Sequence, residues 1–190
     1  MIHGMRVLTG LVFILATLSI ADAQQLLLIQ RQWSSITGLA NATVYRDCVE
    51  VKWDASYRFE HAAAEFGQPD RHQIHIGKFT DDEMKQLQGI LEASALSQLS
   101  TPPLGHSMTF ATDLDQFWVA IARGKQPQML FFDSSSSSGQ KVSTGTKLPS
   151  LYKTEAMKPL LDWYKQLGKR KNDVDKTATP ACSFTVRVTD

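Results

Sequence analysis

The chain has 190 residues, of which 20 are basic and 19 are acidic, so its formal net charge is +1. A charge this small excludes a whole-molecule field that attracts nucleic acid or an anionic membrane, and a hydrophobic content of 43% excludes a disordered chain. Two cysteines are too few for a disulfide scaffold or a four-cysteine zinc site.

The first segment has the three parts of a secretory signal peptide. Arg6 provides positive charge, residues 7–20 are uncharged, and Ala21-Asp22-Ala23 has the small-x-small pattern of a cleavage site. As a helix, the uncharged run spans about 21 Å, which is shorter than the roughly 30 Å hydrocarbon core of a bilayer. We therefore expect residues 1–23 to be removed. The product is an exported protein, periplasmic or secreted, with no stable membrane span.

Export changes how the two cysteines are interpreted. Outside a reducing cytosol, Cys48 and Cys182 are expected to form a disulfide, which would close a loop of about 135 residues and contribute about 5 kcal/mol in the chain-entropy model. The alternative is a reactive free thiol, which needs a base and a positive setting, but the neighbours of Cys48 supply only Arg46 beside Asp47. Cys48 shares a strand face with the polar Glu50, while Cys182 shares a face with the apolar Phe184. The bond therefore requires a bulge, or a Cys48 that lies before the regular strand pairing begins.

Hydrophobic periodicity predicts several strands in the first part of the mature chain. In chain order, the sequence predicts a strand at 26–32, a loop at 34–43, strands at 49–53 and 57–60 joined by a turn at 54–56, a locally helical stretch at 61–65, and a strand at 72–79.

Two helices are predicted further along. Thr80-Asp81-Asp82-Glu83 is a capping box, and apolar residues follow it at helical spacing. The second helix begins close to Pro159 and ends at Gly168. Between and after the helices, the sequence predicts a hairpin with strands at 117–122 and 129–132, and a final strand at 184–188.

This order of elements predicts a single α+β domain over residues 24–190, in which an antiparallel sheet packs one face against two helices. Five consecutive serines interrupt the domain and indicate a flexible serine-rich loop near 133–147.

Four short motifs stand out along the chain. They are Asp54-Ala55-Ser56-Tyr57, Thr80-Asp81-Asp82-Glu83, Ala95-Leu96-Ser97-Gln98-Leu99 and Pro159-Leu160-Leu161-Asp162-Trp163. Together they resemble a type of uncharacterised exported bacterial protein that contains a domain of unknown function. This chain departs from the type at Ala55, where a turn glycine is usual. Because the type has no assigned function, the resemblance implies no catalytic residue.

The histidines are the first candidates for a metal site. His72 and His75 have the H-x-x-H spacing that forms a chelate on a helix, but on a strand residues three apart point to opposite faces. We therefore expect one partly buried and one exposed histidine. His61 and His106 are the other histidines of the mature chain.

No nucleotide-phosphate motif and no serine-nucleophile motif occurs in the sequence. No cofactor is therefore expected, and no residue is assigned a catalytic role. A two-carboxylate hydrolase stays open, because the spacing of distant acids is not readable from sequence.

A modest basic cluster lies in and after the second helix, close to Trp163 and Tyr164. Its members are Lys165, Lys169, Arg170, Lys171 and Lys176. An anionic glycan or nucleic acid is one possible ligand, but solvated cations at the negative end of a helix dipole are the simpler interpretation.

These observations predict an exported soluble protein that is non-catalytic and serves as an envelope or secreted binding or interaction module, with an unknown partner. A secreted hydrolase with dispersed active-site residues is the alternative. A deep pocket where His72 or His106 meets a carboxylate would favour it. A protein that binds metal through its histidines is the third hypothesis.

Overall fold

The computed structural model describes residues 24–36, 42–65, 70–103, 114–135, 148–170 and 174–181. The predicted signal peptide, the predicted strand at 184–188, Cys182 and His106 lie outside the described residues. So does most of the serine-rich loop, of which only residues 133–135 are described.

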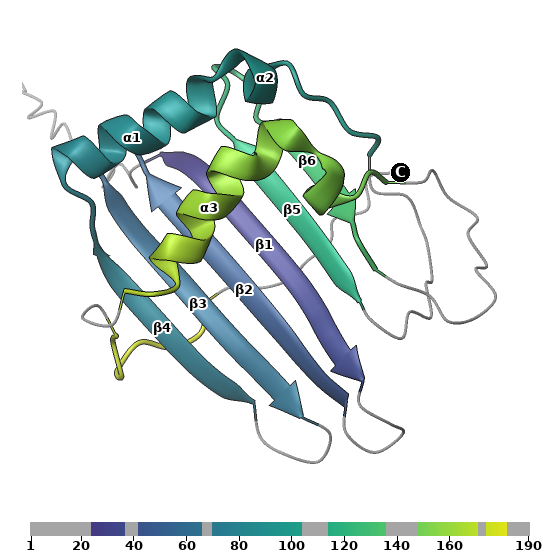
Figure 1. Ribbon diagram of the computed structural model, residues 1–190. Coiled ribbons are helices and arrows are strands. Elements are labelled where there is room, and N and C mark those ends of the chain that lie inside the picture. Colours follow the sequence, from purple (N-terminus) through teal and green to yellow (C-terminus); the bar gives the residue numbers. More distant parts are fainter. Residues whose placement is uncertain are drawn as a thin grey trace, which may run out of the picture.

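Six strands form one antiparallel sheet in the order β4-β3-β2-β1-β5-β6 (Figure 1). The strands are β1 (Gln25–Ile36), β2 (Ala42–Lys52), β3 (Ser56–Glu65), β4 (Arg71–Lys78), β5 (Asp115–Ile121) and β6 (Gln128–Asp133). β1 lies in the middle and pairs with β2 on one side and β5 on the other.

The helices lie together on one face of this sheet, and α3 runs across the strands (Figure 1). They are α1 (Asp81–Glu92), the short α2 (Ser94–Ser97) and α3 (Lys158–Leu167), which two 3₁₀ turns precede at Leu151–Lys153 and Glu155–Met157. The prediction of an α+β fold with an antiparallel sheet is therefore confirmed.

Three strands are longer than the sequence predicted. Residues 61–65, which favour helix locally, form the second half of β3, and residues 34–36 and 42–43 extend β1 and β2. Ala62, Ala63 and Ala64 pair with residues of β2 in register. The hydrogen-bonded ladder on both sides of β3 outweighs the high helix propensity of alanine.

Strong local signals predicted both long helices correctly. The Thr80 hydroxyl accepts the Glu83 N–H, and the Glu83 carboxylate accepts the Thr80 N–H at 2.8 Å, which completes the capping box of α1. Glu83 also contacts Arg170, just beyond α3. The start of α1 is thereby linked to the end of α3.

The core lies between the helices and the half of the sheet nearest the β2–β3 turn. Alternate residues of four adjacent strands form two apolar cross-strand rows there. One row contains Val119, Ile29, Val49 and Phe59, and the next contains Ile121, Leu27, Val51 and Tyr57. Helix residues such as Leu87, Leu91, Leu160 and Leu167 cover these rows. Each such side chain contributes about 1.5–3 kcal/mol on burial.

The C-terminal segment lies along the outer edge of β4. Val174 forms an isolated bridge with His75, and the Asp175 N–H donates to the Ile74 carbonyl at 2.8 Å. Part of the outward-facing backbone of this edge strand is therefore paired within the same chain.

The outer edge of β6 is also partly covered. The Phe131 N–H donates to the Thr101 hydroxyl at 2.8 Å, and the Asp133 N–H donates to the Pro149 carbonyl at 3.1 Å. Two outward-facing donors of this second edge strand thus have partners from loops.

Candidate functional site

The helices leave the other half of their sheet face uncovered. Strand alternation continues beyond the apolar rows into a polar row of Arg31, Asp47, His61 and Gln73, and then into a row that contains Trp33 and Tyr45. We call these six residues the open face. Its position follows from register, because the five residues on β1, β2 and β3 are each two or four positions along their strand from a core residue, and Gln73 pairs with His61.

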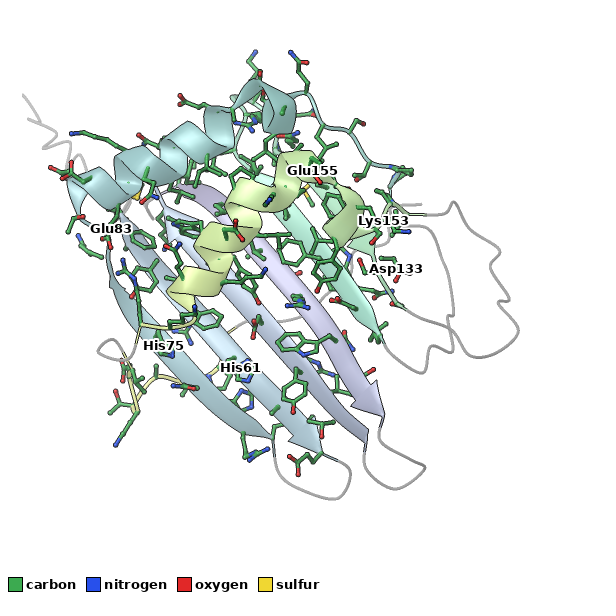
Figure 2. All side chains as sticks on the ribbon, viewed as in Figure 1. His61, His75, Glu83, Asp133, Lys153 and Glu155 are labelled. Carbon is green, nitrogen blue, oxygen red and sulfur yellow. The ribbon has the colours of Figure 1, made fainter. Side chains whose placement is uncertain are left out.

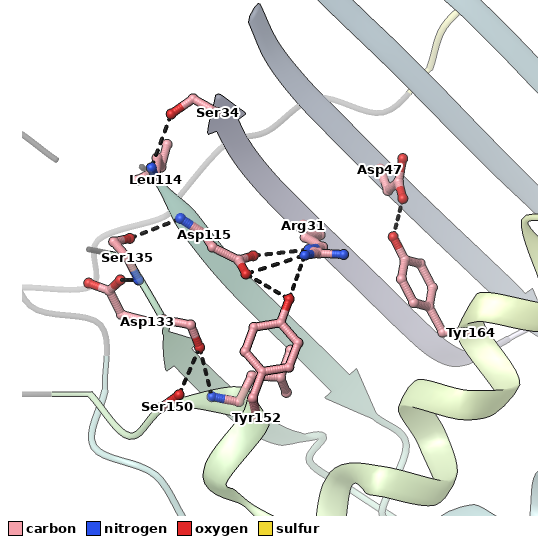
Figure 3. Close-up of polar contacts among 12 residues, drawn as sticks. Arg31, Ser34, Asp47, Leu114, Asp115, Asp133, Ser135, Ser150, Tyr152 and Tyr164 are labelled. Atoms are coloured by element: carbon pink, nitrogen blue, oxygen red, sulfur yellow. Dashed lines mark hydrogen bonds and ion pairs between the residues drawn. The ribbon is translucent and has the colours of Figure 1, made fainter. Parts of the chain in front are cut away.

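Asp47 is the centre of the open face. Its side chain is buried, with a residue exposure of 6%. One carboxylate oxygen lies 2.6 Å from His61 Nδ1, and the other accepts the hydroxyl of Tyr164 from α3 (Figure 3 shows the second contact). Burial, together with the adjacent Asp47 charge, raises the pKa of Tyr164 well above its usual value. The hydroxyl therefore stays protonated and donates at neutral pH, so both carboxylate oxygens have a partner.

His61 joins this pair to a stack of aromatic rings. The Tyr45 ring stacks 5.2 Å from Trp33 and 5.9 Å from His61, with interplanar angles of 18° and 23°, and the Trp33 and His61 rings are tilted at 40° with centres 5.9 Å apart. The Arg31 guanidinium lies 4.6 Å from the Trp33 ring centre. All of these side chains are half-buried. We call this cluster of three mutually contacting rings from three adjacent strands the aromatic stack; His61 is labelled in Figure 2.

Arg31 is held in place from the opposite side. Its guanidinium donates to the two Asp115 oxygens at 3.0 and 3.2 Å and to the Tyr152 hydroxyl at 2.7 Å, and that hydroxyl donates to Asp115 at 2.8 Å (Figure 3). A forked contact of this kind fixes the plane of the guanidinium. Arg31 therefore presents a rigid positive surface to Trp33.

A cavity of about 380 Å³ lies between the open face and the C-terminal end of α3. Its walls are polar on the sheet side and cationic on the helix side. It is lined by Arg31, Trp33, Asp47, Phe59, His61, Gln73, His75, Tyr164, Lys165, Gly168 and Lys169. A second cavity of about 610 Å³ extends from His61 and Gln73 around β4 to Lys176. The two cavities share His61 and Gln73 as lining residues.

The two histidines of the H-x-x-H motif lie on opposite faces of β4. His75 is buried beside the Phe59 ring at 5.5 Å, whereas His72 is exposed. The strand geometry predicted from the sequence is therefore confirmed for this pair. Within the described ranges, no group of three or more metal-ligating side chains comes together.

The predicted basic cluster does not form one patch. Lys165 and Lys169 line the first cavity and Lys176 lines the second, while Arg170 stacks over Tyr57 and Phe79 beside the core. Lys171 lies outside the described residues. Only the lysines therefore face the open half of the sheet.

The contact between Asp47 and His61 was not predicted from the sequence. His61 was assigned to a helical stretch, although Tyr57, Phe59 and His61 continue one period-two pattern that predicts a shared strand face. Asp47 likewise shares parity with Val49 and Val51. Extending both patterns by one more residue would have placed the carboxylate and the imidazole on the same face.

The opposite face of the sheet holds a smaller cavity of about 240 Å³, lined in part by Cys48, Glu60 and Ala181. Glu60 accepts the Ala181 N–H at 2.9 Å and pairs with Cys48 across the strands. The C-terminal segment therefore reaches the polar face on which Cys48 lies.

None of the described helices is both long enough and apolar enough to span a membrane. Comparison with protein-family models and with curated proteins finds no match to this chain.

Proposed function

We propose that the protein is an exported, non-catalytic binding module that holds a small ligand in the cavity above the open face. The main observation that supports this proposal is the aromatic stack of Trp33, Tyr45 and His61, which is half-buried beside a cavity of about 380 Å³. Aromatic walls with a few fixed polar groups are typical of small-molecule sites.

The rigidity of the open face supports this function. Asp47 fixes His61, Asp115 fixes Arg31, and Arg31 covers Trp33. A surface whose side chains are already ordered loses little conformational entropy when a ligand binds. The partly exposed Trp33 and Tyr45 lie outside the hydrophobic core cluster.

Two tryptophan variants, one in the cavity and one outside it, test ligand binding at the open face. In ligand-observed NMR against a library of small polar molecules, we expect hits whose saturation-transfer signal disappears in Trp33→Ala. Trp53→Ala is the matched control, since Trp53 is 49% exposed at the β2–β3 turn and outside the cavity. A library without hits, or hits that survive Trp33→Ala, would contradict binding at the open face.

Export and the disulfide between Cys48 and Cys182 belong to the same proposal. Export is supported by the charge, apolar run and small-x-small pattern of residues 1–23. The bond is supported by the Ala181–Glu60 contact, because Ala181 directly precedes Cys182 and Glu60 is the cross-strand neighbour of Cys48. Mass spectrometry of the exported chain should show a new N-terminus at Gln24. It should also show that neither cysteine is alkylated unless the protein is first reduced. A full-length chain with two alkylated thiols would contradict both parts.

A secreted hydrolase is the second candidate, and the Asp47–His61 contact of 2.6 Å favours it. A carboxylate on Nδ1 leaves Nε2 as the ring nitrogen that accepts a proton, which is the arrangement of a general base. Turnover of ester, glycoside or phosphate chromogenic substrates that is lost in His61→Gln and kept in His72→Gln would establish hydrolysis. The second substitution is matched, because His72 is exposed on the opposite face of the sheet.

A further inference from the structure

We infer that the ligand of the open face is an acidic sugar, a hexuronate or an oligosaccharide that contains one. This inference rests on the binding function proposed above and specifies its ligand. It follows from the charge at the rim of the cavity, the orientation of the aromatic stack and the hydrogen-bonding groups beside the stack.

The charges at the cavity favour an anion. Lys165 and Lys169 line its helix side. Lys165 has only an exposed contact of 4.0 Å with Asp162, and Lys169 has no ion-pair partner among the described residues. By contrast, Asp47, the one carboxylate in the lining, has both oxygens engaged by His61 and Tyr164. The cavity therefore offers positive charge to a ligand and no unengaged negative charge.

The aromatic stack favours an oxygen-rich ligand over a flat aromatic one. Trp33, Tyr45 and His61 contact one another pairwise, with ring centres 5.2 to 5.9 Å apart, and Arg31 lies over Trp33, so these ring faces are partly covered. A nucleobase or another flat ring requires a free ring face. The ring edges that remain accessible carry the positive end of the ring quadrupole. Hydroxyl and carboxylate oxygens are therefore the better partners for this surface.

The polar row beside the stack fits hydroxyl groups. Gln73 provides both an amide donor and an amide acceptor, and His61 has its second ring nitrogen available once Nδ1 faces Asp47. Each sugar hydroxyl both donates and accepts, so this mixed set pairs with adjacent hydroxyls. A simple fatty or aromatic carboxylate would leave these groups without partners in the cavity, which costs affinity.

The test uses the complete exported chain, labelled with ¹⁵N, and maps amide shifts. The probes are glucuronate, galacturonate, mannuronate and iduronate, each compared with its uncharged methyl ester, together with adenosine monophosphate as a flat aromatic anion. We expect at least one hexuronate to shift the amides of Trp33, Tyr45 and His61, and its ester to bind at least threefold more weakly. Raising the salt concentration from 20 to 200 mM should weaken binding of the acid more than of the ester.

Charge removal gives the second measurement. Lys165→Gln and Lys169→Gln should each weaken hexuronate binding about threefold, the effect of one exposed ion pair, and leave ester binding unchanged. Lys85→Gln is the matched control, because Lys85 is an exposed lysine on α1 outside the cavity.

The outcomes separate the two proposals. If esters bind as tightly as acids, or only adenosine monophosphate shifts the open face, the acidic-sugar inference is wrong while the binding function stands. If the hexuronates shift only amides elsewhere, or shift none while library compounds shift the open face, the inference is also wrong. If no probe and no library compound shifts the open face, the binding function fails with it.

Discussion

At the scale of single residues, the arrangement around Asp47 shows how a buried charge is accommodated. Its carboxylate lies at the boundary between the apolar rows and the open face, with His61 on one oxygen and Tyr164 on the other. A buried carboxylate that loses a donor is costly, because part of its charge is left unpaired. The contact between Asp47 and Tyr164 also joins α3 to β2.

Tyr164→Phe should lower the free energy of unfolding by about 1–3 kcal/mol, because the variant keeps the ring and loses only the donor to Asp47. Urea denaturation measures the change. Tyr152→Phe is the control, since this hydroxyl contacts Asp115 at the exposed surface, and its loss should cost less than about 1 kcal/mol. Equal losses in the two variants would contradict the role of the buried contact.

The same tyrosine predicts a dependence on alkaline pH. Its folded pKa is raised above the usual value of 10.0, so its contribution to stability is fully present below pH 10. Above that pH the unfolded chain loses the tyrosine proton first, and the stability falls by up to about 1.4 kcal/mol per pH unit from this group. Tyr164→Phe should therefore flatten the alkaline limb of the stability curve, which urea titrations between pH 9 and 11 would reveal.

Ala55 has an unfavourable backbone conformation. It lies in the β2–β3 turn at a φ of 68°, the left-handed region that glycine adopts readily. Ala55→Gly should raise the thermal midpoint, with a gain of about 0.5–1 kcal/mol after the loss of its methyl contact with the core. Ala95→Gly, at an exposed position of α2, should instead lower stability. A destabilised Ala55→Gly variant would contradict this argument.

At the scale of elements, α1 depends on its first turn. The capping box satisfies two backbone groups at the start of the helix, and Glu83 also contacts Arg170 after α3. A helix of this length is marginal without packing and end contacts. The first turn of α1 therefore helps to fix how the two long helices lie against each other.

Thr80→Ala should lower the free energy of unfolding by about 1 kcal/mol, because the Glu83 N–H loses its acceptor. Thermal unfolding followed by circular dichroism measures the effect. Ser94→Ala also removes a hydroxyl at the start of a helix, but Ser94 is not the residue that precedes α2, so stability should stay the same or rise slightly. An unchanged free energy of unfolding in Thr80→Ala would show that the helix cap is dispensable.

Local signals explain why some elements were predictable and others were not. The capping box, Pro159 and Gly168 act within a few residues of themselves, so the start of α1 and both ends of α3 followed from the sequence. The end of α1 at Glu92 has no such signal and was not predicted. The second half of β3 has no such signal, because its strand conformation depends on partners in β2 and β4. The open face was missed for the same reason, since Asp47 and His61 become neighbours only through register.

At the scale of the whole molecule, one core joins the helices to half of the sheet. Leu160 of α3 is fully buried within this core. One cluster of buried residues contains side chains from α1, α3 and five strands of the sheet. We therefore expect the domain to unfold cooperatively, with the open face as a rigid extension of the same sheet.

Leu160→Ala should lower the free energy of unfolding by about 2–5 kcal/mol, because it leaves a cavity between α3 and the sheet. Chemical denaturation followed by both tryptophan fluorescence and circular dichroism should show coincident transitions. Met129→Ala is the control, since Met129 is 45% exposed on β6, and its change should stay near 0.5 kcal/mol or below. Separate transitions by the two probes would contradict a single cooperative core.

The partial cover of the two edge strands, β4 and β6, affects how readily the protein self-associates. An edge strand with unpaired N–H and C=O groups is a template onto which another molecule can add a strand, and this addition is a common route to aggregates and fibrils. Here residues 174–175 occupy part of the β4 edge, and Thr101 and Pro149 occupy two donors of β6. The chain thus protects its own sheet against edge-to-edge growth, and truncation before residue 174 should promote self-association at high concentration.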